Sequence, residues 1–342
     1  MSRPLCDDAR LEDPLLADNE RLRWLAGTGA RIRRAALNEP VGQLSRADRP
    51  RGVLVFGSEA RLVRAVLEPS CPVPFMAWPG PGLPAWVGPL DLVVVLGHRQ
   101  SQAWVVQCAA EAVRRGATVI VAAPEGCELS AATASPNTTV VPTTNSDPMA
   151  AAVAVLALLG ALGLGPEVRP EHVADAADLV AEACSPAADL SVNPGKALAL
   201  GLAERLPLIW GGTTLAGRAS RRIAEAIRRA SGVPALAADD SELDTLLRAV
   251  PPKDLFADPG EVDQLEPVLV LLDDDKLPAP LTATADRLAR LADAVDVRVV
   301  RISSGDAQIE TTDLERYVTL LQHGYYGAAY LEIALTPVEE VR

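Results

Sequence analysis

The stretch Leu206–Arg229, LPLIWGGTTLAGRASRRIAEAIRR, decides the fold of this 342-residue chain. It predicts a buried strand over Leu206–Trp210, then a Gly-Gly-Thr-Thr turn and a helix. Glycines in the turn let a ligand approach the backbone, and the start of a helix presents N–H groups with partial positive charge. Gly212, Thr213 and Thr214 are therefore candidate ligands of a phosphate or carboxylate, with helix capping as the alternative role of the threonines.

Aliphatic strands alternate with helical stretches along the chain, which indicates an α/β fold with parallel sheets. An unbroken run such as Leu90–Leu96 is typical of a strand buried on both faces. The pattern occurs twice in the same order. GVLVFGSEARLVRAVLE at Gly52–Glu68 corresponds to the stretch quoted above, LDLVVVLG corresponds to PVLVLLDD, and ATVIVAA corresponds to VRVVRIS. Internal duplication of one α/β unit is the simplest explanation, and two unrelated α/β domains are the alternative.

The predicted organisation has five segments, and the terminal helices are expected to pack on the body. The segments are an N-terminal helical segment (1–45), a first α/β subdomain (46–165), a helical linker (166–204), a second α/β subdomain (205–310) and a C-terminal helix (311–342).

Composition restricts the classes of function. A formal net charge of -13 argues against nucleic acid as the main partner, because phosphate backbones need a basic surface. The longest apolar run, Met149–Gly165, is shorter than the roughly 20 residues of a membrane span, so we expect a buried helix and no membrane segment. The five scattered cysteines predict reduced thiols in a cytoplasmic protein and no metal site. No nucleotide-binding glycine motif follows a predicted strand, and no cofactor is expected.

A second group of candidate ligands follows the strands of the first half. Gly57 lies in the turn after the first strand, and His98 and Arg99 follow the buried run at the expected start of a helix. A phosphate there would gain two side-chain partners as well as the helix end, at the strand ends where open α/β sheets bind ligands. A solvated loop is the alternative. The equivalent place in the second half holds Asp273–Asp275, for which we expect a solvated turn that binds no phosphate.

The duplicated pattern resembles the sugar isomerase (SIS) fold, and more narrowly the bifunctional phosphoglucose/phosphomannose isomerase family and its diverged actinobacterial relatives. The resemblance covers about Gly52 to Val338. Phe56-Gly57-Ser58 stands where the family has a GxGGS-type turn, and Arg218 and Glu225 are in register with an arginine and a glutamate of a family helix. The end of the chain resembles the C-terminal motif of the family at Gly324, Tyr326, Tyr330, Leu331 and Thr336-Pro337-Val338-Glu339.

The resemblance implies two SIS subdomains, a homodimer and a ligand that is glucose 6-phosphate, fructose 6-phosphate or mannose 6-phosphate. It implies that Ser58 and Ser101 contact the phosphosugar and that Glu225 is the base of an aldose–ketose isomerisation. Arg218 lies seven residues earlier, on the same side of the helix, and would stabilise the enediolate. The alternative for Glu225 is a surface ion pair with Arg221.

The sequence also departs from the family. Only Ser101 keeps a hydroxyl of the family's phosphate loop, and Thr245 stands in place of the family's histidine. His323 on the C-terminal helix is a candidate replacement for that imidazole, with an ordinary helix residue as the alternative. Two hypotheses follow: a sugar-phosphate isomerase with a degenerate site, or a phosphosugar-sensing or partner-binding protein that has lost catalysis.

Overall fold

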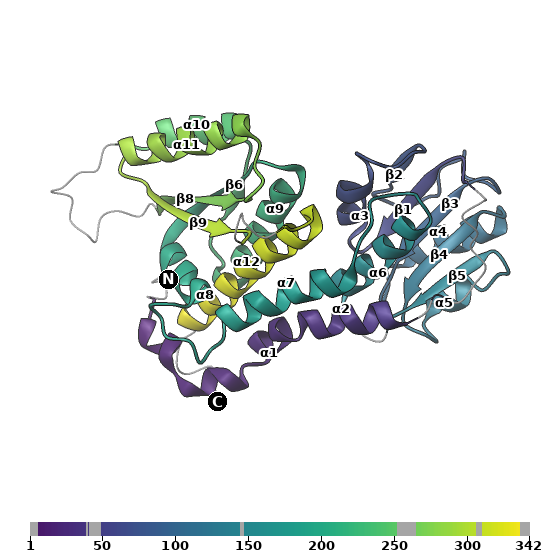
Figure 1. Ribbon diagram of the computed structural model, residues 1–342, viewed down its shortest axis with the longest axis horizontal. Helices are drawn as coiled ribbons and strands as arrows, with labels where there is room; N and C mark the ends of the chain where they lie inside the picture. The colour runs from purple at the N-terminus through teal and green to yellow at the C-terminus, as the bar shows by residue number, and fades with distance from the viewer. Residues whose placement is uncertain are drawn as a thin grey trace. The chain divides into compact units, whose positions relative to one another are not determined.

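The computed structural model describes residues 6–38, 40, 49–143, 147–251, 265–305 and 310–335. The chain divides into two compact units, which we call the first unit (Thr28–Asp175) and the second unit (Met1–Gly27 with Ala176–Arg342). Each unit contains one parallel β-sheet with flanking helices (Figure 1). The predicted α/β fold with two parallel sheets is confirmed, whereas the five-segment division stays a prediction.

The first sheet has the strand order β2-β1-β3-β4-β5, and all neighbouring strands are parallel. The strands are β1 (Val53–Gly57), β2 (Phe75–Ala77), β3 (Leu92–Leu96), β4 (Thr118–Ala123) and β5 (Thr138–Pro142). β3 is buried along its whole length, as the aliphatic run predicts. Gly57 pairs with Leu96, so the carboxyl ends of β1 and β3 lie at the same level.

Helices of the first unit cover this sheet. They are α2 (Thr28–Leu37), α3 (Ala60–Leu67), α4 (Ala103–Arg114), α5 (Glu128–Ala132) and α6 (Pro148–Ala161), and α7 (Pro170–Ala183) runs across the boundary between the units. α6 is the apolar helix that the sequence predicts, and no helix in the described ranges is long and apolar enough to cross a membrane. α2 packs on α6, where Arg31 Nε donates to Asp147 Oδ2 at 2.5 Å and both side chains are buried.

The second sheet has the order β7-β6-β8-β9, again all parallel. The strands are β6 (Arg205–Gly211), β7 (Leu236–Ala237), β8 (Glu266–Asp273) and β9 (Arg298–Ser303). These strands correspond in sequence to β1, β2, β3 and β4, so both sheets have the same strand connectivity. That agreement supports the predicted duplication. Within the described residues, the second sheet ends at β9 and has no counterpart of β5.

Two layers of helices flank the second sheet. Figure 1 shows α10 and α11 on one face, and α8, α9 and α12 on the other. The elements of this unit are η1 (Asp8–Glu12), η2 (Pro14–Asp18), α1 (Glu20–Ala26), α8 (Pro194–Leu202), α9 (Thr214–Ser231), α10 (Asp240–Arg248), α11 (Ala279–Ala294) and α12 (Asp313–Leu335). The stretch Thr336–Glu339, which contributed to the family resemblance, lies outside the described residues.

The C-terminal helix α12 packs closely against α8 and α9. A Cβ at Gly324 would lie 2.3 Å from the side chain of Ile223, and one at Gly327 would lie 2.3 Å from that of Leu198. The N-terminal segment meets the same helix, because the Asp7 N–H donates to the Ala334 carbonyl oxygen at 3.2 Å. The predicted packing of both terminal segments on the body is confirmed within this unit.

Candidate functional site

In both sheets the strand order reverses beside the first strand of the repeat. In the first sheet β2 lies on one side of β1, and the next strand, β3, lies on its other side. In the second sheet β7 and β8 flank β6 in the same way. Ligands of open α/β sheets bind outside the carboxyl ends of the strands at such a point. We call residues 57–59 and 97–102 the first switch point, and residues 211–214 and 273–276 the second switch point.

The backbone of the first switch point depends on Gly57. Its φ is +97°, and a Cβ there would lie 2.0 Å from the Leu96 carbonyl oxygen. Glu59 and Gln102 precede α3 and α4, and in the described part of the chain neither makes a side-chain capping hydrogen bond. Two helices therefore begin here with N-terminal N–H groups that no N-cap side chain satisfies, an arrangement that favours an anion.

The two candidate serines of this switch point are bonded to the backbone. Ser58 Oγ donates to the Leu96 carbonyl oxygen at 3.1 Å. Ser101 Oγ accepts from the His98 N–H at 3.1 Å and donates to the His98 carbonyl oxygen at 2.9 Å. His98 is partly buried, and Arg99 is exposed beside it. The hydroxyls thus shape the loop, and the cationic side chain open to solvent is that of Arg99.

The second switch point is occupied by an arginine of α12. Arg316 Nε donates to Asp274 Oδ1 at 2.6 Å and lies 3.2 Å from Asp275 Oδ1, and its guanidinium also contacts Asp313. Asp274 is 8% exposed and Arg316 is 5% exposed. Burial acts to lower the pKa of Arg316, but the charges of and hydrogen bonds to Asp274 and Asp313 outweigh it and raise that pKa. The expectation of a solvated turn at Asp273–Asp275 is wrong, because Arg316 supplies the counter-charge for buried carboxylates.

The Gly-Gly-Thr-Thr turn belongs to the same network. Thr213 Oγ1 donates to Asp274 Oδ2 at 3.0 Å and accepts from the Ala216 N–H at 3.1 Å, so Thr213 caps α9. Thr214 is exposed, and a Cβ at Gly212 would lie 2.6 Å from the Trp210 ring. Thr213 is therefore both a helix cap and a partner of the buried carboxylate. The Thr213 hydroxyl already donates its hydrogen bond within the protein, to the Asp274 carboxylate.

Glu225 lies on α9 between two arginines. Its Oε1 accepts from Arg229 Nη2 at 2.5 Å, and its Oε2 lies 3.7 Å from Arg222 Nη1. These are the residues at i+4 and i−3, rather than Arg221. Arg218 is partly buried and lies about 10 Å away along the helix axis, because each residue adds ~1.5 Å.

A cavity of about 220 Å³ opens beside Glu225. We call it the arginine pocket; its lining residues are Arg21, Trp24, Leu25, Arg222, Glu225, Ala226, Arg229 and Tyr325. They come from α1, α9 and α12. Sequence reasoning missed Arg21, because nothing in the sequence indicates that α1 lies beside α9.

His323 lies on α12, one residue before Gly324. Burial lowers the pKa of His323 to about 4, so the imidazole is neutral at pH 7. A neutral imidazole donates one hydrogen bond and accepts another, but it carries no charge with which to stabilise an enediolate. Within the described residues, no group of three or more His, Cys, Asp or Glu side chains lies together as a metal site.

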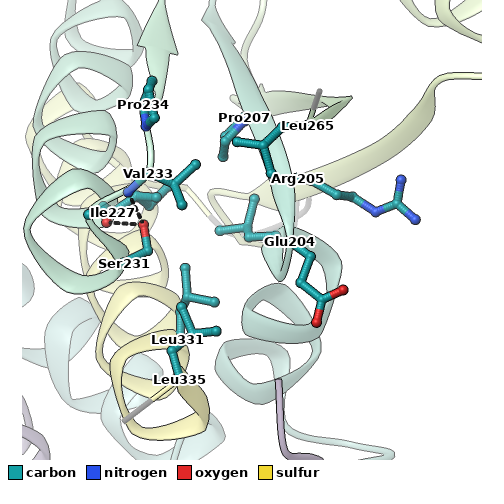
Figure 2. Close-up of a pocket in the computed structure, with 12 residues that line it drawn as sticks. Glu204, Arg205, Pro207, Ile227, Ser231, Val233, Pro234, Leu265, Leu331 and Leu335 are labelled. Carbon is teal, nitrogen blue, oxygen red and sulfur yellow. Dashed lines mark hydrogen bonds between the residues drawn. The ribbon is translucent and has the colours of Figure 1, made fainter. Parts of the chain in front are cut away.

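A second cavity, of about 290 Å³, lies at the amino end of β6 (Figure 2). Its lining is mostly apolar: Leu202, Glu204, Arg205, Pro207, Ile227, Ser231, Gly232, Val233, Pro234, Leu265, Leu331 and Leu335. Ser231 Oγ donates to the Ile227 carbonyl oxygen at 2.8 Å and accepts from the Val233 N–H at 3.1 Å. This apolar pocket contains none of the predicted site residues, and its hydroxyl is bonded to the backbone.

Comparison with known proteins identifies the fold. No protein-family model matches the chain, and no curated protein matches it significantly. A hypothetical protein from Thermus thermophilus is similar in structure, with a TM-score of 0.66, 13% identity, and coverage of 96% of this chain and 90% of that one. Tagatose-6-phosphate ketose/aldose isomerase from Escherichia coli matches with a TM-score of 0.60, 13% identity, and coverage of 97% and 94%.

A third structure supports the same fold. The C-terminal domain of glucosamine-fructose-6-phosphate aminotransferase from Francisella tularensis matches with a TM-score of 0.61 and 11% identity, covering 92% of this chain and 96% of that one. The chain thus has the double α/β fold of phosphosugar isomerases. At these identities the likeness is one of fold.

Proposed function

We propose that this chain binds a sugar phosphate and that the phosphate is held at the first switch point. The observation that carries the proposal is the contrast between the two switch points. At the first, β1 and β3 end at the same level and the next helices begin without side-chain caps. At the second, Thr213 caps the helix and Arg316 is buried against Asp274. The fold shared with a tagatose-6-phosphate isomerase supports the ligand class.

Main-chain groups and Arg99 take the largest part in this site. A phosphate dianion would accept hydrogen bonds from N–H groups at the starts of α3 and α4, where no N-cap side chain bonds them, and its charge would be matched by the Arg99 guanidinium. The His98 imidazole would donate a further hydrogen bond. Gly57 lets the backbone come close. Ser58 and Ser101 reach the phosphate only by turning their hydroxyls away from the backbone carbonyls that they now contact.

Calorimetric titration of the full chain tests this proposal. We expect glucose 6-phosphate, fructose 6-phosphate or mannose 6-phosphate to bind, and glucose not to bind. The His98→Ala/Arg99→Ala variant should lose at least tenfold in affinity, about 1.4 kcal/mol. Arg114→Ala removes an exposed arginine that pairs with Glu111 at the far end of α4, and serves as the matched control. Equal binding of glucose, or wild-type affinity in the double variant, contradicts the proposal.

Isomerisation of glucose 6-phosphate or mannose 6-phosphate to fructose 6-phosphate is the second candidate. One observation favours it: the carboxylate of Glu225 lines a solvent-open cavity with cationic and aromatic neighbours. In this role Glu225 is the base, Arg218 stabilises the developing oxyanion, and neutral His323 exchanges hydrogen bonds. Conversion of glucose 6-phosphate by the wild type, lost in Glu225→Gln, supports it. Binding without turnover supports the sensing role instead.

The assembly state is a separate proposal. The resemblance to the isomerase family implies a homodimer, and the five scattered cysteines indicate a cytoplasmic protein. Light scattering of the purified chain at micromolar concentration tests the dimer, and a monomer mass contradicts it.

A further inference from the structure

The arginine pocket gathers three guanidinium groups around one cavity. Arg21 comes from α1, and Arg222 and Arg229 come from α9. None of them belongs to the first switch point, and the pocket lies wholly within the second unit. Their side chains are 39%, 36% and 75% exposed, so an ion from solvent can reach them.

Among the described residues, two carboxylates contact these three cations. Glu225 contacts Arg222 and Arg229, and Glu332 pairs with Arg21. Burial lowers the pKa of Arg21, and the charge of Arg229 lowers it further, which means that the two guanidinium groups repel each other. An anion placed among the three arginines relieves that repulsion.

The remaining walls indicate the size and chemistry of the ligand. Trp24, which is 48% exposed, and Tyr325 line the same cavity and offer aromatic surface to a small carbon skeleton. A volume of about 220 Å³ is below the ~300–1,000 Å³ of typical drug-sized sites, so a small molecule fits better than a nucleotide. Guanidinium groups match phosphate oxygens in pairs, which favours a phosphate monoester.

We propose that the arginine pocket is a second anion site, which binds a small phosphate monoester independently of the first switch point. Arg222 and Arg229 hold the phosphate, and Arg21 approaches it from α1. In the unliganded protein the carboxylate of Glu225 occupies the two α9 arginines, so the incoming phosphate competes with it. This inference does not rest on phosphate binding at the first switch point, and it adds a phosphate ligand to the cavity beside Glu225 that the second candidate function uses.

Titration with inorganic phosphate tests the site. The experiment uses the full-length His98→Ala/Arg99→Ala variant in low-salt buffer, so that the first switch point does not contribute. We expect one saturable site whose affinity falls at least tenfold when Arg222→Ala and Arg229→Ala are added. Adding Arg21→Ala instead should weaken it about threefold, and adding Arg114→Ala should leave it unchanged. Absence of saturable binding, or wild-type affinity after loss of both α9 arginines, overturns the proposal.

Charge-preserving and charge-neutralising variants keep the result independent of folding. If the alanine variant does not fold, Arg222→Lys with Arg229→Lys replaces it. This variant preserves charge but not the paired hydrogen bonds, and should weaken phosphate binding about threefold to tenfold. Glu225→Gln should tighten phosphate binding about threefold, because it removes the competing carboxylate. Glu68→Gln, which breaks an exposed pair with Arg64, is its control and should have no effect. Weaker phosphate binding in Glu225→Gln contradicts the competition.

Because the pocket and the first switch point are removed by different variants, their failures are distinguishable. A tenfold weaker affinity for glucose 6-phosphate in His98→Ala/Arg99→Ala, with the remaining phosphate binding removed by the α9 arginine substitutions, supports both sites. Retention of sugar-phosphate binding there with loss in the α9 arginine variant contradicts the first switch point and leaves the arginine pocket as the phosphate site.

Discussion

The two switch points have the same strand connectivity but different neighbours at their strand ends. At the first, Leu96 ends β3 against Gly57, and an exposed Arg99 follows. At the second, β8 continues into Asp274, which is buried against Arg316 of α12. The comparison teaches that a duplicated framework supplies two equivalent strand-end positions. At the second, two buried carboxylates and an arginine from a later helix fill the place where, as we propose, the first binds a phosphate.

The largest expected effect comes from Arg316→Ala. It leaves the Asp274 and Asp275 carboxylates buried without their cation, which should destabilise the second unit by about 3–5 kcal/mol. Hydrogen exchange resolves the two units, so faster exchange of β8 amides with unchanged β3 amides is the expected result. Arg99→Ala at the first switch point is the matched variant and should change neither by more than about 0.5 kcal/mol. Unchanged protection of β8 in Arg316→Ala contradicts the role of Arg316 as the counter-charge of the second switch point.

Gly57→Ala tests the first switch point in the same way. The left-handed φ and the contact with the Leu96 carbonyl oxygen predict a loss of about 2–3 kcal/mol in the first unit, seen as faster exchange in β1 and β3. Gly80, which has no atom within 4 Å of its added Cβ, provides the control. If Gly57→Ala and Gly80→Ala exchange alike, the first switch point does not depend on this backbone.

Acidic pH should weaken the second unit through His323. Its folded pKa of about 4 lies below the ordinary 6.5, so the unfolded chain takes up the proton first as the pH falls. Stability is therefore full above pH 6.5 and declines towards pH 4, by about 2 kcal/mol at pH 5. Unfolding between pH 7.5 and 4.5 measures it. His323→Gln should flatten the decline, and His172→Gln, an exposed position on α7, should not.

The smallest expected effect on stability comes from giving the first switch point a side-chain helix cap, as the second already has. Gln102→Asp adds a side-chain cap to α4 and should stabilise the first unit by about 0.5–1 kcal/mol. The added negative charge should also weaken glucose 6-phosphate binding. Gln102→Asn adds a neutral cap and is the control. If Gln102→Asp binds glucose 6-phosphate as tightly as the wild type, the phosphate does not lie at the start of α4.

Sequence reasoning predicted the framework because strands and helices depend on local patterns. The aliphatic runs located β3 and β8, and the order of similar segments in the two halves predicted the shared connectivity. The five-residue helix α5 was missed, since it is too short to show helical periodicity.

The site was harder to predict because it depends on contacts between distant residues. Arg316 lies about 40 positions from Asp274, and no local pattern indicates that it neutralises that carboxylate. The serines at 58 and 101 have the expected residue type, but their hydroxyl protons go to nearby carbonyls. Arg21 approaches Glu225 only because α1 packs near α9, which the sequence does not reveal.

The second unit is discontinuous in sequence, and this has a consequence for synthesis. The partner of Arg21, Glu332, is added 311 residues later, and Thr28–Asp175 is translated in between. Because a ribosome delivers residues in order, the first unit can fold on the nascent chain while α1 still lacks the helix that it packs against. We expect α1, with Trp24 on its surface, to be the segment that chaperones meet during translation.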